Sequence, residues 1–76
     1  MNVYGVEIPE DLIVKAIKRM QSSNFRCVHI ESVFYLGGVK YKGNVATRAA
    51  DRLIQQQRKK GLIKYENGCW SWVGEL

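Results

Sequence analysis

The sequence predicts one small domain of the α+β class, with three helices packed against a C-terminal two-stranded hairpin. Apolar residues recur at spacings of three and four over residues 9–22 and 45–60, which is the period of an amphipathic helix. Near the end of the chain, Asn67-Gly68 separates two short apolar and aromatic runs, and this pair is a strong hairpin signal. A length of 76 residues suits a single domain, residues 1–76.

The segment before the first helix, residues 1–8, has apolar side chains at nearly alternate positions: Val3, Tyr4, Val6 and Ile8. This alternation allows a marginal strand, and it leaves open an N-terminal arm that pairs with another chain in a dimer. We expect no secretory signal, because no basic region is followed by an apolar stretch. No apolar run approaches the roughly 20 residues that span a bilayer, so we expect a cytoplasmic protein with no membrane partner.

The first helix is predicted over residues 9–22. Pro9 suits the first helical position because its φ angle is already fixed, and acidic side chains follow where they favour the helix dipole. Its apolar face comprises Leu12, Ile13, Ala16, Ile17 and Met20. Residues 25–28 favour a brief strand and residues 29–36 a shorter second helix, with a strand as the competing interpretation there. Gly37-Gly38 ends this element, and a loop follows over residues 38–43.

The third helix has the strongest helical period and is predicted from Val45 to Lys60. Asn44 stands at the N-cap position, and Gly61 is the glycine that ends the helix. The predicted inner face comprises Val45, Ala46, Ala49, Ala50, Leu53 and Ile54. The opposite, solvent-facing arc comprises Thr47, Arg48, Asp51, Arg52, Gln55, Arg58 and Lys59.

The last element is a hairpin formed by residues 62–66 and 69–73. A two-residue turn sets the register, so that Glu66 faces Cys69 and the pairing continues to Ile63 opposite Trp72. One face then holds Ile63, Tyr65, Trp70 and Trp72. We expect this face to close the core, and a stacking platform for single-stranded nucleic acid is the alternative.

Almost all of the net charge lies in residues 40–60. Seven Lys or Arg residues against Asp51 give this stretch +6, whereas residues 1–36 sum to zero and residues 61–76 to −1. Asp51 either pairs with Arg48 or Gln55 on the helix surface or tunes base choice by accepting from a cytosine amine. A helix arc with one sign of charge indicates a surface that binds a polyanion.

The element order, together with the stretch ATRAADRLIQQQRKKGLIKYENGCWSW, resembles a winged helix-turn-helix domain of small bacterial and phage regulators. The resemblance covers about residues 9–73, and Gly61-Leu62-Ile63 is its most specific part. It implies sequence-specific binding of double-stranded DNA and transcription regulation, with the third helix in the major groove. The implied DNA-binding residues are Lys40, Lys42, Asn44, Thr47, Arg48, Arg52, Gln55, Arg58 and Lys59. By position, the resemblance places Thr47, Arg48, Arg52 and Gln55 at base edges. It places Lys40, Lys42, Arg58, Lys59 and also Lys60 on the phosphate backbone.

Signals of catalysis are missing from the sequence, so we expect no enzyme, cofactor or metal. The glycines form no phosphate-binding loop, and Cys27, His29 and Cys69 stand at no metal-ligand spacing. We expect both cysteines to be free thiols. The short hairpin with Glu66 at its tip leaves an alternative function open, a protein-interaction adaptor within a larger complex. A homodimer or another protein partner also remains open.

Overall fold

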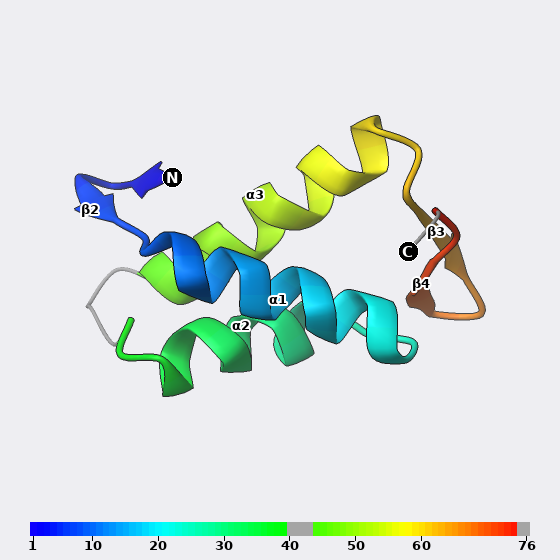
Figure 1. The fold of residues 1–76 in the computed structure, drawn as a ribbon, viewed down its shortest axis with the longest axis horizontal. Helices are drawn as coiled ribbons and strands as arrows, with labels where there is room; N and C mark the ends of the chain where they lie inside the picture. Colours follow the sequence, from blue (N-terminus) through cyan, green and yellow to red (C-terminus); the bar gives the residue numbers. More distant parts are fainter. Residues whose placement is uncertain (40–43, 75–76) are drawn as a thin grey trace.

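The computed structural model describes residues 1–39 and 44–74, and it has the predicted α+β architecture. The elements, in chain order, are β1 (Asn2–Val3), β2 (Val6–Glu7), α1 (Glu10–Ser22), α2 (Cys27–Leu36), α3 (Val45–Lys59), β3 (Ile63–Glu66) and β4 (Cys69–Trp72). The three helices pack together, with the hairpin β1–β2 at one end and the hairpin β3–β4 at the other (Figure 1). The arrangement is compatible with a winged-helix-like domain. Of the helices in the described ranges, none has the length and apolar character needed to cross a membrane.

The core lies where the apolar faces of the three helices meet. Leu12 and Met20 from α1 and the fully buried Phe34 of α2 belong to one buried cluster. The side of α3 that faces them carries Ala49 and Ala50, both 0% exposed. Alanine adds little bulk, so α2 and α3 can approach closely while the larger side chains fill the remaining space.

The chain between α1 and α2 contributes one bridge to the C-terminal hairpin in place of the brief strand expected over residues 25–28. The Phe25 amide donates to the Trp70 carbonyl at 2.9 Å, and the Trp70 amide donates back at 2.7 Å. The helix begins at Cys27, two residues earlier than predicted, so the helical interpretation of this region is confirmed. At its start, Nδ1 of His29 accepts a hydrogen bond from the Arg26 amide at 2.9 Å.

The end of α3 follows the predicted glycine stop. Gly61 has a φ of +73°, its amide donates to the Arg58 carbonyl at 3.0 Å, and the Leu62 amide donates to the Gln57 carbonyl at 3.1 Å. This bond pair is the Schellman motif, which satisfies carbonyls that the helix leaves without partners. At the other end Asn44 occupies the N-cap position, but its side chain makes no capping hydrogen bond because its backbone is left-handed, with φ 61°.

The C-terminal hairpin has the predicted register throughout, from Glu66 opposite Cys69 to Ile63 opposite Trp72. Ile63 is buried, and both tryptophans are half-buried against the core. Tyr65 was expected to help close the core, and this was wrong, because the side chain is 58% exposed. It lies next to the turn and packs edge-on against Trp70 instead, with ring centroids 5.0 Å apart.

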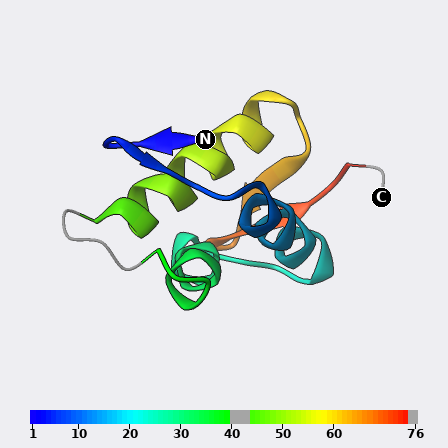
Figure 2. The same ribbon diagram turned by 60° about the vertical axis from the view of Figure 1, so that its left-hand side comes forward.

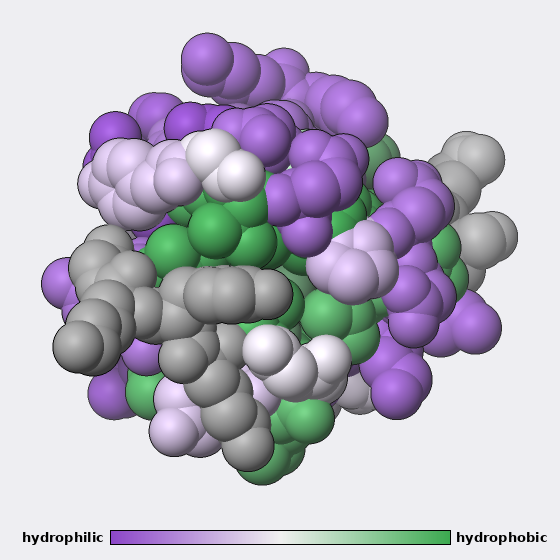
Figure 3. Space-filling model, turned by 90° about the vertical axis from the view of Figure 1, so that its left-hand side faces the viewer, coloured by the Kyte–Doolittle hydropathy of each residue, from purple (hydrophilic) through white to green (hydrophobic). Residues whose placement is uncertain are grey.

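Residues 1–8 form a second hairpin that folds onto the body of its own domain. Asn2 pairs with Glu7 and Val3 with Val6, around a turn at Tyr4-Gly5 where both φ angles are positive. Val3 is 0% exposed and Ile8 is 1% exposed, so these two apolar side chains enter the core. Figure 2 shows this hairpin running beside α3. Viewed toward this end of the molecule, hydrophobic residues lie at the middle and hydrophilic residues border them above and to the right (Figure 3).

Replacing Gly61 by alanine is expected to lower the free energy of unfolding by about 1 kcal/mol, because an L-residue is strained at positive φ. A Cβ atom at this position would meet nothing within 4 Å, so conformation alone sets the cost. Urea unfolding would measure it, with Lys60→Ala, at an ordinary φ of −79°, as the matched control. Equal losses in the two variants would contradict the assignment of Gly61 as the helix stop.

Candidate nucleic-acid interface

The polar arc of α3 faces solvent along the whole helix. Thr47, Arg48, Arg52, Arg58 and Lys59 are all exposed, and Gln55 is half-buried. The opposite side is anchored in the core. The helical period therefore keeps the arginines outside, as the sequence requires.

Within the described residues, no ion pair neutralises the cations of α3. Over residues 44–60, five Lys or Arg residues against Asp51 leave a net charge of +4. Two ion pairs form among the described residues: the N-terminal ammonium of Met1 pairs with Glu7, and Lys64 pairs with Glu66. Neither involves α3. Charges of one sign without counter-charges raise the local positive potential, which attracts an anionic partner.

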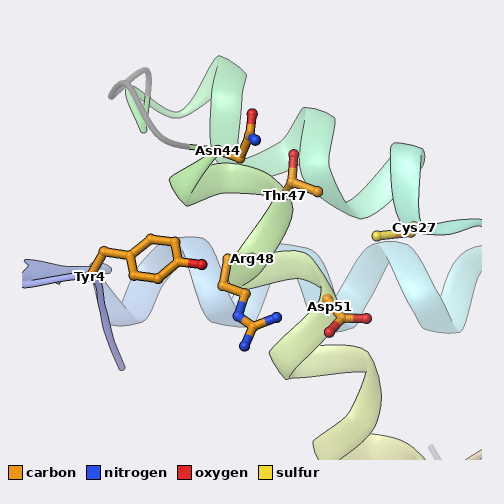
Figure 4. A pocket seen from close by; sticks show the side chains of 6 residues that line it. All are labelled: Tyr4, Cys27, Asn44, Thr47, Arg48 and Asp51. Atoms are coloured by element: carbon orange, nitrogen blue, oxygen red, sulfur yellow. The ribbon is translucent and has the colours of Figure 1, made fainter.

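An open pocket of about 250 Å³ lies over the first two turns of α3. Three elements line it: the β1–β2 turn, the start of α2, and α3 itself. Figure 4 shows Tyr4 on one side of α3 and Cys27 on the other. The full lining comprises Tyr4, Cys27, Asn44, Thr47, Arg48 and Asp51. Thus three predicted DNA-binding residues, Asn44, Thr47 and Arg48, come together at one hollow.

Asp51 lies in this pocket without a polar partner among the described residues. A surface pair with Arg48 or Gln55 was one expectation, and the structure forms neither. Gln55 instead accepts a long hydrogen bond from Arg58, at 3.4 Å. The Asp51 charge acts on Cys27, because burial, the Asp51 carboxylate and the Glu31 carboxylate together raise the pKa of this thiol. The Arg48 side chain is exposed, and its guanidinium makes no hydrogen bond with any described residue, so its donors remain available.

Arg52 is exposed but tied to the N-terminal hairpin. Its guanidinium donates a short hydrogen bond to the backbone carbonyl of Asn2. This bond joins α3 to β1, and the base contact that the resemblance implies for Arg52 stays a prediction. Fifty positions separate the two residues, so helical periodicity gave no signal of the contact.

The structure brings only part of the predicted set together. Lys40 and Lys42 lie outside the described residues. Arg58 and Lys59 are exposed at the far end of α3, away from the pocket. Sequence reasoning missed Tyr4 as a lining residue, although a Tyr-Gly pair between two valines was a weak signal for a turn. It also left unassigned Gln57, which is buried at 3% exposure four residues after Leu53 on the core face.

Comparison with protein-family models, curated proteins and solved structures finds no match, so the interpretation of this surface depends on its own geometry. In the described part of the chain, no group of three or more His, Cys, Asp or Glu side chains is placed to hold a metal ion. The arrangement offers hydrogen-bond donors and positive charge at an exposed helix, which is chemistry for binding an anion.

The Cys27 thiol is expected to react slowly with iodoacetamide at neutral pH, because the thiolate is the reactive form and its pKa is raised. In a Cys69→Ser background, the alkylation rate measured against pH should reach half its maximum above the ordinary thiol value of about 8.5. Asp51→Asn should move this midpoint down, and Glu10→Gln serves as the charge control. An identical midpoint in the folded and urea-unfolded chains would contradict the assigned environment.

Proposed function

We propose that this domain binds double-stranded DNA in a sequence-specific manner and regulates transcription as a winged helix-turn-helix protein. The observation that carries the proposal is the exposed basic arc of α3, whose cations form no ion pair within the described residues. A surface of this kind attracts the phosphate backbone, and its polar side chains can read base edges.

The dimensions of α3 suit the major groove. Its 15 residues extend about 22 Å at a rise of 1.5 Å per residue, and the major groove admits a helix. In helix-turn-helix proteins, the first residues of the recognition helix contact the bases. Here those positions are Asn44, Thr47 and Arg48, which hydrogen-bond bases well and which line the open pocket.

Arg58, Lys59 and Lys60 extend the same charge to the last turn of α3. They lie about 15 Å or more from Thr47 along the helix axis, a distance that suits phosphates flanking the bases read. We assign Lys40 and Lys42 to the backbone as well, from the sequence alone. The proposal implies a small regulator of the bacterial, phage or prophage type that works in the cytoplasm. A domain of this size reads few base pairs, so a homodimer on a two-fold site fits the proposal.

The C-terminal hairpin contributes little to this interface. Its tip carries Glu66, which pairs with Lys64 at 3.0 Å, and the hairpin lies at the opposite end of the molecule from the β1–β2 turn (Figure 1). An acidic tip repels phosphate. Its tryptophans are half-buried against the core, which argues against a free stacking platform for single strands.

A protein-interaction adaptor is the second candidate function. The observation that favours it is the apolar outer side of α2, where Val28 is 56% exposed and Leu36 is 79% exposed. The affinity of the domain for duplex DNA at low salt decides between the two functions.

Arg48→Ala is expected to weaken duplex binding by about tenfold, because a guanidinium in a specific contact contributes about 1–3 kcal/mol. Discrimination between the selected and random duplexes should also fall, since a base contact carries the sequence preference. Gel shifts at two salt concentrations would measure both effects, using a random-sequence duplex pool and the pool selected by the wild-type protein.

Two matched variants sharpen this test. Lys15→Ala removes one exposed cation from α1 and should leave binding to the selected pool nearly unchanged. Arg48→Lys keeps the charge but cannot form the bidentate hydrogen bonds that a guanidinium makes to a base. It should therefore reduce discrimination between the two pools more than it reduces total binding. If the wild type does not bind either pool at low salt, or if Arg48→Ala and Lys15→Ala behave alike, the DNA-binding proposal fails and the adaptor function replaces it.

A further inference from the structure

We infer that the N-terminal hairpin is a second part of the nucleic-acid interface, in which the Tyr4 hydroxyl contacts a DNA phosphate beside Arg48. This inference rests on the proposed DNA-binding function. It assigns to β1–β2 a contact with the phosphate backbone.

The hairpin has a fixed position relative to α3. Val3 and Ile8 are buried in the core, and the Ile8 amide donates to the Met1 carbonyl at 2.7 Å. The Arg52 guanidinium bonds the Asn2 carbonyl from the α3 side. These contacts place the turn beside the first half of the helix, where the exposed base-reading side chains lie. A turn held in this way can contact DNA without a large ordering cost.

Tyr4 is the first of the two turn residues between β1 and β2. Its φ of 51° is left-handed, and its side chain is 67% exposed, although a tyrosine ring usually contributes to stability through burial. The hydroxyl forms no hydrogen bond with any described residue. In Figure 4 the ring extends from the hairpin toward α3, and its hydroxyl lies on the side of Arg48. A phenol hydroxyl and a guanidinium on the same side of a pocket are both donors to phosphate oxygen.

The electrostatic setting favours a phosphate at this place over any neutral group. Arg48 and Arg52 lie one helical turn apart on the solvent side of α3. Each guanidinium has five N–H donors. The Asn2 carbonyl occupies only part of the donor set of Arg52, so this residue positions the hairpin and still adds positive charge. Asp51 lies one turn further along, between α3 and the start of α2, on the Cys27 side of the pocket rather than the Tyr4 side (Figure 4).

Tyr4→Phe tests the inference because it removes the hydroxyl and keeps the ring. With the selected duplex pool, we expect binding to weaken by about three- to tenfold, the range for one lost phosphate hydrogen bond. The salt slope and the thermal unfolding midpoint should not change, since the substitution removes no charge and no hydrogen bond to a described residue. Tyr65→Phe, an exposed tyrosine on the other hairpin, is the matched control and should bind like the wild type.

A gain-of-function pair completes the experiment. Tyr4→Arg should strengthen binding and steepen the salt slope by about 0.9, because it adds a phosphate contact. Tyr65→Arg adds the same charge at the far end of the molecule, beyond the screening length of about 10 Å, and should have little effect.

The outcomes separate this inference from the proposed function. If Arg48→Ala weakens binding while both Tyr4 variants behave like their Tyr65 controls, DNA binding stands and the role of the hairpin is overturned. If the wild-type protein does not bind the duplex pools at low salt, both proposals fail.

Discussion

The buried face of α3 is the contact that organises this domain. Ala49 and Ala50 are 0% exposed, and Leu53 and Ile54 are at most 2% exposed. A buried leucine or isoleucine contributes about 1.5–3 kcal/mol, a large share for a domain whose total stability is of the order of 5 kcal/mol. Once this face is buried, the helical period alone determines that the arginines of α3 are outside.

The same helix accepts an electrostatic cost on its exposed side. Like charges four residues apart, as at Arg48 and Arg52, destabilise a helix by about 0.2–0.5 kcal/mol. The described part of the protein offers α3 no acidic partner, and the Asn2 carbonyl offsets only part of this repulsion. A glutamate placed between the arginines would remove this repulsion, but α3 contains none. The retained repulsion is consistent with the proposed anionic ligand.

The two hairpins have similar size and different physical roles. The C-terminal hairpin closes the core through its half-buried tryptophans and is joined to the α1–α2 connection by the Phe25–Trp70 bridge. The N-terminal hairpin places Val3 and Ile8 in the core but leaves Tyr4 outside, beside the basic helix. The polar character of the turn residues, Glu66 at one end and Tyr4 at the other, gives the two ends of the molecule different chemistry.

The elements with local signals could be predicted from the residues alone. Helical period set the faces of α1 and α3, the Asn67-Gly68 turn set the register of β3–β4, and Gly61 set the end of α3. The contacts between residues far apart in the sequence follow from tertiary packing. They are the hydrogen bond from Arg52 to Asn2 and the positions of Tyr4 and Cys27 at the pocket over α3. These contacts join residues about twenty to fifty positions apart. Their formation depends on how whole elements pack, and neither periodicity nor turn chemistry carries that information.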